Sequence, residues 1–531
     1  MKKALLVLVV LYSQILFAQK EISSKEADLK FKNGDYESAL TDYLKLFKDD
    51  PKSEEYNYRI GVCYLNSNVN KVKAIPYLEN VTKREHFDNN ALYLLGRAYH
   101  YAYRFDDASR AYNRFKDVGK GTSENLKDVE KQIQYCFNSK EVIKFPVNVT
   151  FQNLGRNINS SYADYYPFVS SDEAFIIYNS LRPDAGSFIK PDGNYPPSAY
   201  RSEIKSGFFS KSENISKNFD VPDGEEEVVG MSPDGSILLI YHDDFKGKSN
   251  IYAMHIDSAK KYSDPVKLDG QVNTSHHEIA ASINNEGDIL YFASDRSGGK
   301  GGTDIYVTKK LPTGEWGVPQ NLGEPINSAA NEDFPNISPD GKTLYFSSNG
   351  HTSMGGYDIF KSTWDEKSQR WVNLKNLGYP INTPYDNMNF RISSNGRYGY
   401  ISALRSGGQG DLDIYRVTFN EVEHNYVVIK GIVNPKEANV NKPFSYKKIN
   451  IKVVDNSKKD LYGLYQANPI NGRYIIIVPP GNYDIEVSHE GFVTDKYTVD
   501  IPVKIIQDSE INKDFYLPVD GAATTTQSNG N

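Results

Sequence analysis

Residues 326–360 read INSAANEDFPNISPDGKTLYFSSNGHTSMGGYDIF, and this stretch decides the fold of the middle of the chain. It recurs in register. Residues 272–306 read VNTSHHEIAASINNEGDILYFASDRSGGKGGTDIY, and residues 381–415 read INTPYDNMNFRISSNGRYGYISALRSGGQGDLDIY. More degraded copies occupy residues 158–204 and 220–252. Short strands that recur at an interval of about 50 residues are typical of β-propeller blades.

One copy predicts four strands. Residues 334–338 and 343–347 alternate apolar and small side chains around Pro339-Asp340-Gly341, which predicts two strands joined by a tight turn. Gly341 can supply the positive φ that such a turn needs without steric cost. Residues 357–361 predict a third strand, and residues 370–374 predict an outer fourth strand.

The recurrence of this unit predicts a ring of sheets. One four-stranded sheet cannot bury both of its faces alone, so neighbouring copies must pack against each other. The five copies predict five blades within residues 145–421, and residues 147–151 are expected to supply the strand that closes the ring. A sixth blade within residues 182–200 is the alternative, although the Pro, Gly and Asp content of that segment favours a loop.

Residues 20–140 have the pattern of paired helices. Small residues recur at matching points of three pairs: Ala27, Gly61 and Gly96 in the first helix, and Ala39, Ala74 and Ala108 in the second. Helices that cross closely need small residues at the crossing, and this spacing resembles three tetratricopeptide (TPR) repeats of about 34 residues. Residues 125–137 are predicted to form the helix that caps such an array.

An array of this kind has a concave groove that commonly holds a peptide or a partner helix. The candidate groove residues are Tyr58, Tyr93, Arg97, Tyr101 and Arg104. The alternative for the tyrosines is packing between helices, and the alternative for the arginines is simple solvation.

Residues 427–518 predict a third, all-β domain. Seven short strands in about 90 residues indicate a small sandwich. The sequence VPPGNYDIEVSHEGF at residues 478–492 has a strong Pro-Pro-Gly turn signal and resembles the carboxypeptidase regulatory-like domain, an accessory module without catalytic residues. Residues 519–531 are low in complexity and are predicted to be a disordered tail. The predicted fold class is therefore multidomain α+β.

The first 18 residues predict export. Lys2 and Lys3 precede an apolar run at residues 4–11, and residues 17–19 (FAQ) form a cleavage site, as in a signal peptide. No Cys lies near that site, so no lipid attachment is expected there, and no later run of 18 apolar residues predicts a membrane span. Cys63 and Cys136 are the two cysteines, and we expect buried thiols rather than a disulfide scaffold.

The sequence offers no catalytic motif. The run Gly230-Met231-Ser232-Pro233-Asp234 departs from G-x-S-x-G at its last position, and phosphate-loop, H-E-x-x-H and paired-Cys motifs are missing. His276-His277-Glu278 is a weak metal candidate, because adjacent residues of a strand point to opposite faces. A net charge of −7 without a basic cluster argues against nucleic acid as a partner. We therefore predict no enzyme activity, no cofactor and no metal.

One polar position recurs in all five copies just before the innermost strand. Its residues are Asp164, Glu226, Glu278, Glu332 and Asn387. They could form a ring at one mouth of the central channel that binds a cation or a basic segment. The favoured alternative is a structural clasp, in which each carboxylate accepts backbone amides of the next blade. A second set is aligned at the start of the third strand and is interpreted as structural: Glu203, Asn250, Asp304, Asp358 and Asp413.

The motifs SPDGKTLYFSSN (residues 338–349) and SDRSGGKGGTDIY (residues 294–306) closely resemble PD40, or TolB-like, propeller repeats, a WD40-like class. The order of signal peptide, TPR repeats, PD40 propeller and regulatory-like sandwich is similar to that of PorE-like proteins of Bacteroidota. That resemblance implies a periplasmic, non-enzymatic scaffold that binds envelope proteins near the outer membrane, in type IX secretion or gliding.

Two expectations depart from that family. Its members continue into an OmpA-like peptidoglycan-binding domain, whereas this sequence ends at Asn531 after the sandwich, so direct binding to peptidoglycan is not expected. The tail also lacks the β-rich C-terminal domain of type IX cargo, which favours a resident of the periplasm. The alternative function is a ligand-sensing propeller that binds a glycan, a peptide or a cation at the polar ring.

Overall fold

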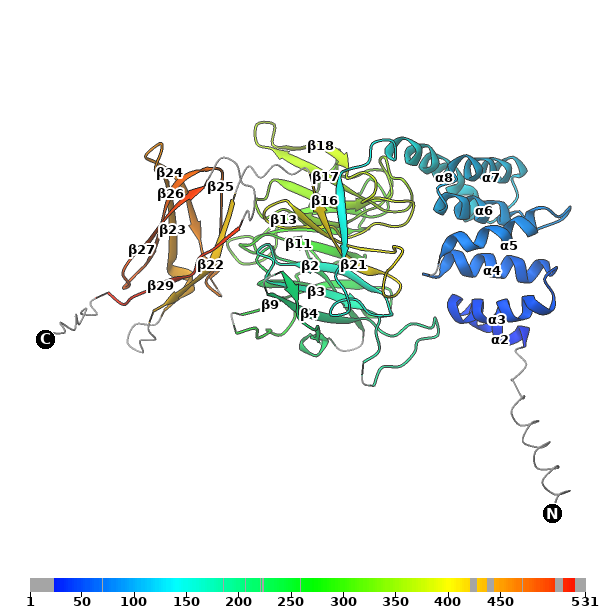
Figure 1. The fold of residues 1–531 in the computed structure, drawn as a ribbon, viewed down its shortest axis with the longest axis horizontal. Coiled ribbons are helices and arrows are strands. Elements are labelled where there is room, and N and C mark those ends of the chain that lie inside the picture. The colour runs from blue at the N-terminus through cyan, green and yellow to red at the C-terminus, as the bar shows by residue number, and fades with distance from the viewer. Residues whose placement is uncertain are drawn as a thin grey trace, which may run out of the picture. The chain divides into compact units, whose positions relative to one another are not determined.

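The computed structural model describes residues 23–520, apart from 69, 185, 206, 220, 222–223, 258, 421–426, 437–443, 470 and 502–509 (Figure 1). The predicted signal peptide, and the predicted tail from residue 521 onward, lie outside the described residues. The chain divides into a helical unit, Met1–Glu141 with Pro183–Pro196, and an all-β unit that contains the rest. Among the described residues, no helix combines the length and the apolar character needed to cross a bilayer.

The helical unit consists of helices that pack in sequence order. They are α2 (Ser24–Lys32), α3 (Tyr36–Asp49), α4 (Glu54–Asn66), α5 (Ala74–Thr82), α6 (Asn90–Tyr101), α7 (Phe105–Val118) and α8 (Ser123–Val142). From α2 to α7 each helix packs against the next. Several hydrogen bonds tie α8 to this stack; for example, Tyr93 donates to Asp128 (2.6 Å) and Tyr112 donates to Gln132 (3.3 Å).

The small residues lie where the helices cross, as predicted. A Cβ atom added at Gly96 would lie 2.5 Å from the ring of Tyr112, and one added at Gly61 would lie 2.6 Å from Leu78. The four matching alanines are fully buried: Ala27, Ala39, Ala74 and Ala108. Cys63 and Cys136 are buried free thiols, as predicted, and burial raises the pKa of each thiol to about 12.

Five antiparallel sheets are described between Val149 and Phe419, one for each copy of the repeat. The first is β2 (Asp164–Val169), β3 (Phe175–Ser180), β4 (Ser198–Lys205) and β5 (Phe208–Phe209), with β6 (Glu213–Asn214) also on β4. The second is β7 (Glu225–Met231), β8 (Ile237–Asp243), β9 (Ser249–His255) and β10 (Val266–Lys267). The third is β11 (Glu278–Ile283), β12 (Ile289–Ser294), β13 (Asp304–Lys309) and β14 (Gln320–Asn321).

The fourth sheet is β15 (Glu332–Ile337), β16 (Thr343–Ser348), β17 (Asp358–Asp365) and β18 (Arg370–Asn376). The fifth is β19 (Arg391–Ile392), β20 (Tyr398–Ala403), β21 (Asp413–Phe419) and β1 (Val149–Asn153). Strand β1 precedes all the repeats in the sequence, yet it pairs antiparallel with β21, the third strand of the last repeat. The expectation of a closing strand before the first repeat, at residues 147–151, is thus met with a shift of two residues.

The innermost strands form a closed ring. Strand β2 contacts β7, β7 contacts β11, and β11 contacts β15. Asn336 on β15 donates a hydrogen bond of 2.9 Å to the carbonyl of Phe390 beside β19, and β19 and β20 contact β2. Sheets arranged in a ring, each with one edge strand toward the central axis, are the architecture of a β-propeller. The turns of the repeat have the predicted left-handed backbone, with φ of 71° at Gly341 and 52° even at Glu173.

The inner strands carry β-bulges that direct side chains into the centre of the ring. Register shifts interrupt the pairing of β2, β7, β11 and β15 with their neighbours. Tyr166 and Phe334 lie at such shifts with φ of 51° and 46°, and their ring centroids are 4.3 Å apart. Together with Val229, Ala280 and Met388 they form one apolar cluster, here called the central plug. Each innermost strand, or the segment leading into it, contributes one residue to this plug, and Tyr241 of β8 also packs against it.

The remaining sheets form the predicted small sandwich. One sheet contains β22 (Val427–Pro435), β25 (Arg473–Val478), β28 (Glu510–Asn512) and β29 (Phe515–Leu517), and the other contains β23 (Ile449–Asp455), β24 (Asp460–Gln466), β26 (Gly481–His489) and β27 (Asp495–Ile501). Alternate residues of both sheets bury a shared core that includes Ile451, Ile476 and Ile485. Val519, expected in the tail, forms a bridge with Phe492.

The segment considered for a sixth blade, residues 182–200, has no described strand before β4 begins at Ser198, in line with the favoured loop. One sequence-based alignment needs correction. Glu203 does not open a third strand, because β4 starts at Ser198 and Glu203 pairs with Phe175 near its other end. The insertion in the first copy displaced the alignment by several residues.

Candidate functional site

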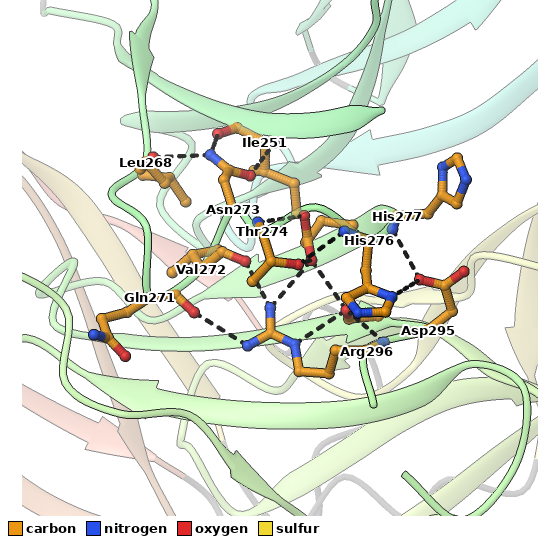
Figure 2. Close-up of polar contacts among 12 residues, drawn as sticks. Ile251, Leu268, Gln271, Val272, Asn273, Thr274, His276, His277, Asp295 and Arg296 are labelled. Carbon is orange, nitrogen blue, oxygen red and sulfur yellow. Dashed lines mark hydrogen bonds and ion pairs between the residues drawn. The ribbon is translucent and has the colours of Figure 1, made fainter. Parts of the chain in front are cut away.

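The recurring polar position belongs to a clasp between neighbouring sheets, shown for the third sheet in Figure 2. Each clasp begins with an Asn in the loop that leaves one sheet. Asn273 accepts the amide of Ile251 on β9 (2.7 Å) and donates to its carbonyl (2.8 Å) and to the carbonyl of Leu268 (2.9 Å). Its side chain therefore satisfies the backbone of the third strand as a neighbouring strand would.

The same pair of backbone bonds occurs at three other junctions. Asn159 holds Ile414 at 2.8 and 3.0 Å, Asn327 holds Ile305 at 2.9 and 2.9 Å, and Asn382 holds Ile359 at 2.8 and 2.8 Å. The motif is visible in the sequence as INS, VNT, INS and INT, but the analysis of charged positions did not single out its Asn.

The residue after each Asn is held by the predicted ring position of the next sheet. Thr274 donates its amide (3.0 Å) and its hydroxyl (2.9 Å) to Glu278, the first residue of β11. Ser328 binds Glu332 in the same way (2.8 and 2.7 Å). The remaining two junctions repeat the pattern with Ser160 on Asp164 (2.6 and 2.9 Å) and Thr383 on Asn387 (2.7 and 3.1 Å). An amide oxygen can replace the carboxylate at Asn387 because only acceptors are needed.

An arginine completes the clasp in the first and third sheets. Arg296 donates to Glu278 (3.2 Å) and to the carbonyls of Val272 (2.6 Å) and Gln271 (3.1 Å) (Figure 2). Arg182 similarly donates to Asp164 and to the carbonyl of Ile158. A buried carboxylate is tolerated only when its charge is paired and its lone pairs are filled, and these contacts meet that requirement.

The burial of their side chains and the hydrogen bonds that their oxygens accept favour the clasp interpretation for three of the five ring residues. Asp164, Glu278 and Glu332 are fully buried. Their carboxylates accept from the loop that arrives from the preceding sheet, which is a different partner from the amides of the next blade that the sequence led us to expect. Glu226 differs, since its side chain is 17% exposed and lies 3.1 Å from His242. Binding of a cation at the ring stays a prediction.

The second polar set also binds loop backbone. Asp304, Asp358 and Asp413 open the third strands β13, β17 and β21. Asp358 accepts the amide of Met354 (2.8 Å) and the side chain of Asn376 (2.9 Å). Asp304 accepts the side-chain amide of Asn321 (2.8 Å). These residues shape the inter-strand loops.

The histidine pair has separate partners. His276 lies 3.7 Å from the carboxylate of Asp295, whereas His277 lies 3.2 Å from the hydroxyl of Ser249. Within the described part of the chain, no group of three or more His, Cys, Asp or Glu residues could hold a metal ion. Ser232 is buried in its turn and donates to Asp234 (2.6 Å).

Three of the predicted groove residues of the helical unit come together on α6. Tyr93, Arg97 and Tyr101 follow each other at intervals of one helical turn, and Arg97 donates to the hydroxyl of Tyr101 (3.4 Å). Tyr93 is a packing residue, since it is 7% exposed and its ring lies 5.8 Å from that of Tyr112. Arg97 and Tyr101 are half-buried.

The other two predicted groove residues are not joined to this column by any described contact. Tyr58, on α4, is half-buried, and burial and then nearby Asp88 raise the pKa of its hydroxyl to about 12. Arg104 is exposed at the start of α7, donates to Asp107 (2.6 Å) and lies over the ring of Tyr99 at 4.3 Å. The candidate surface is therefore centred on Arg97 and Tyr101.

Compared with protein-family models and with curated proteins, the chain matches none. Among solved structures it is similar to TolB from Acinetobacter baumannii, at 16% identity and a TM-score of 0.32 over 59% of this chain and 70% of that one. It is also similar to an endo-arabinase from Bacteroides thetaiotaomicron (14%, TM-score 0.33, 51% and 98%) and to a protein titled glycoside hydrolase (8%, TM-score 0.34, 56% and 96%). At these values the likenesses say nothing about activity, and the propeller architecture rests on the sheet topology itself.

Proposed function

We propose that this protein is a non-enzymatic scaffold that binds envelope proteins of a bacterial periplasm. In this proposal the helical unit is a TPR array, the five sheets are the five blades of a PD40 propeller, and the sandwich is a carboxypeptidase regulatory-like module. In this proposal the recurring polar residues at four of the junctions form internal clasps, and no catalytic set is found among the described residues. Three modules of the interaction type on one chain favour assembly, because linked sites bind with higher effective concentration.

The location belongs to the same proposal. A cleaved signal peptide would deliver the chain to the periplasm, and partners at the outer membrane would hold it there. Its similarity in module order to PorE-like proteins of Bacteroidota favours a role in type IX secretion or gliding. No contact with peptidoglycan or nucleic acid is proposed.

The single observation that carries the proposal is the half-buried Arg97 beside Tyr101 on one face of α6. Arginine and tyrosine are enriched where proteins bind proteins, since both combine a large contact area with directional hydrogen bonds. Tyr93 below them is packed and hydrogen-bonded to Asp128, which fixes the base of this surface.

The experiment is an affinity purification of the tagged full chain from crosslinked envelopes, followed by mass spectrometry. The wild type should enrich outer-membrane and secretion-machinery proteins. Arg97→Glu should lose at least one of them, whereas Arg114→Glu, an equal charge change at an exposed position of α7, should lose none. Full retention of every partner by Arg97→Glu would remove the helical surface from the proposal.

A ligand-sensing propeller is the second candidate. The observation that favours it is a small cavity at the ring of inner strands, on the side of the turns rather than at the polar ring. Replacing Asp164, Glu226, Glu278 and Glu332 together tests whether a ligand binds at the polar ring. A large fall in melting temperature indicates the clasp, and lost ligand binding at an unchanged melting temperature indicates a ring site.

A further inference from the structure

One arginine of the propeller differs from the clasp arginines. Arg391 lies on β19, the innermost strand of the fifth sheet, and is 5% exposed. Its Nη1 donates to the side-chain oxygen of Asn336, and its guanidinium carbon lies 4.5 Å from the ring centroid of Phe168. Its Nε and Nη2 are buried and meet no hydrogen-bond partner among the described residues. Two nitrogens of a buried cation, with three N–H bonds between them, are therefore unsatisfied there.

Within the part of the chain that the structure describes, no carboxylate neutralises this guanidinium. Burial alone lowers the pKa of Arg391 to about 9, so the side chain keeps its positive charge at neutral pH. Arg182 and Arg296, by contrast, each face a buried carboxylate of their own sheet. A buried charge without a counterion is costly, and a fold that retains one leaves room for an ion or a charged group from outside.

Arg391 also differs from the residues at the equivalent positions of the other copies. Counting back from the turn, the positions equivalent to it in the other four copies are Phe168, Gly230, Ser282 and Asn336. The clasp residues are nearly the same in every copy, whereas this inward position holds five different side chains. Two of the four, Phe168 and Asn336, contact Arg391 directly across the ring. A position that varies among otherwise similar blades can give a propeller its specificity for a ligand.

Arg391 lines a cavity of about 20 Å³ at the turn end of the inner strands. The apolar walls include Phe168, Met231 and Ile337, which are buried. Ser171 also lines the cavity, and its buried hydroxyl has no hydrogen-bond partner among the described residues. Pro233, Pro339 and Ile392 at the rim are partly exposed, so the cavity opens toward this end. The space suits one small polar group.

We propose that this cavity binds a carboxylate group, held by Arg391 and Ser171 against an apolar wall. A planar guanidinium with two available N–H groups matches the two oxygens of a carboxylate, which accepts in bidentate fashion. One cation calls for one negative charge, and the small volume favours a group of three or four heavy atoms. The carboxylate belongs either to a free small acid or to the C-terminus of a peptide. This site is independent of the scaffold function proposed above.

The test uses the full chain, with sodium acetate as probe and sodium chloride at equal ionic strength as reference. Saturation-transfer NMR on the acetate methyl group should show saturable binding, and acetate should raise the melting temperature more than chloride does. Arg391→Met should weaken binding at least tenfold. Arg370→Met, an exposed arginine of β18, should bind as the wild type does.

A second variant covers the case in which Arg391→Met does not fold. Ser171→Ala removes one neutral hydrogen bond and should weaken acetate about three- to tenfold. A peptide with a free C-terminus that competes with acetate, while its amidated form does not, identifies the peptide source; if neither competes, the source is a free acid. Wild-type protein without saturable acetate binding, or variants that bind equally well, would overturn the site.

Discussion

Charged side chains are compensated differently at the two ends of the inner strands. At the end where the strands begin, Glu278 and Arg296 neutralise each other and fill their remaining positions with loop backbone. At the turn end, Arg391 is buried and has no carboxylate among the described residues. The first arrangement is found in two sheets, at Asp164 with Arg182 and at Glu278 with Arg296, whereas Arg391 belongs to the fifth sheet alone. In a repeat protein, recurrence therefore indicates what holds the ring together, and the exception indicates where a ligand can act.

The largest effect is expected from a substitution that removes the carboxylate of a clasp and leaves its arginine unpaired. Glu278→Ala should lower the free energy of unfolding by about 3–5 kcal/mol, because it leaves the partly buried Arg296 without its carboxylate and the amide and hydroxyl of Thr274 without their acceptor. All three tryptophans (Trp316, Trp364 and Trp371) lie in the five-sheet region, so their fluorescence during urea unfolding reports on that region alone. Glu366→Ala, at an exposed ion pair, should change it by less than about 0.5 kcal/mol. A loss below about 1 kcal/mol at Glu278 would contradict the clasp.

A second variant concerns a carboxylate without a clasp. Asp333, beside the central plug, is 4% exposed, and burial raises the pKa of its side chain to about 7. Its folded-state pKa exceeds the unfolded value, so the folded state binds the proton more tightly and loses stability as pH rises from about 4 to above 7. Asp333→Asn should therefore stabilise the protein at pH 8 by up to about 4 kcal/mol.

The sign of this effect is checked by repeating the urea titration of Asp333→Asn at several pH values. The advantage of the variant should shrink steadily as the pH falls and vanish below about pH 3, where the wild-type side chain is protonated in both states. An advantage that is independent of pH would indicate that folding does not raise the pKa of Asp333.

A third variant tests the Asn that bridges the third strands. Asn327→Ala removes both bonds to Ile305 and leaves its buried amide and carbonyl without that partner. We expect a loss of about 2–3 kcal/mol in the tryptophan-detected transition, since the buried amide of Ile305 becomes unsatisfied while its carbonyl keeps the amide of Leu322 (3.1 Å). Asn331→Ala, in the same loop, removes a bond to the amide of Thr303 (3.1 Å) and should cost less. Equal effects of the two variants would show that Asn327 has no special role.

The smallest effect is expected from a substitution in the helical unit, and it tests whether this unit unfolds separately from the sheets. Gly96→Ala places a Cβ 2.5 Å from the ring of Tyr112 and should cost the helical unit about 1–3 kcal/mol through overpacking. Circular dichroism at 222 nm should report this loss while the tryptophan signal stays unchanged. A shift of both signals by the same amount would mean that the two units unfold together.

The sequence predicted the features that depend on local chemistry and period. The turn glycines, the small residues at helix crossings and the strand-rich third domain follow from backbone freedom, close approach and alternation, and each is found at or near the expected residues. Glu203 was misplaced because the long insertion in the first copy hides the start of its third strand, which only the pairing of Ser180 with Ser198 reveals.

The candidate sites were harder to predict for a physical reason. Burial along a strand is inferred from strict alternation, but a bulge interrupts that alternation and reverses which side chains face inward. Four inner strands contain such a bulge, and in the fifth copy Asn389 has a φ of 54°. The sequence therefore could not tell whether Phe390 or Arg391 faces the cavity. The polar ring was visible as a recurring charge, while its partners in the preceding loop were not.

The pairing of β1 with β21 sets an order of events during folding. The helical unit can form as soon as it is synthesised, because its contacts link neighbours in sequence. The fifth sheet must wait, since Val149 pairs with Phe419 and the chain between them has to be complete first. Until then β1 exposes an unpaired edge, and this edge is the segment on which we expect a chaperone to act.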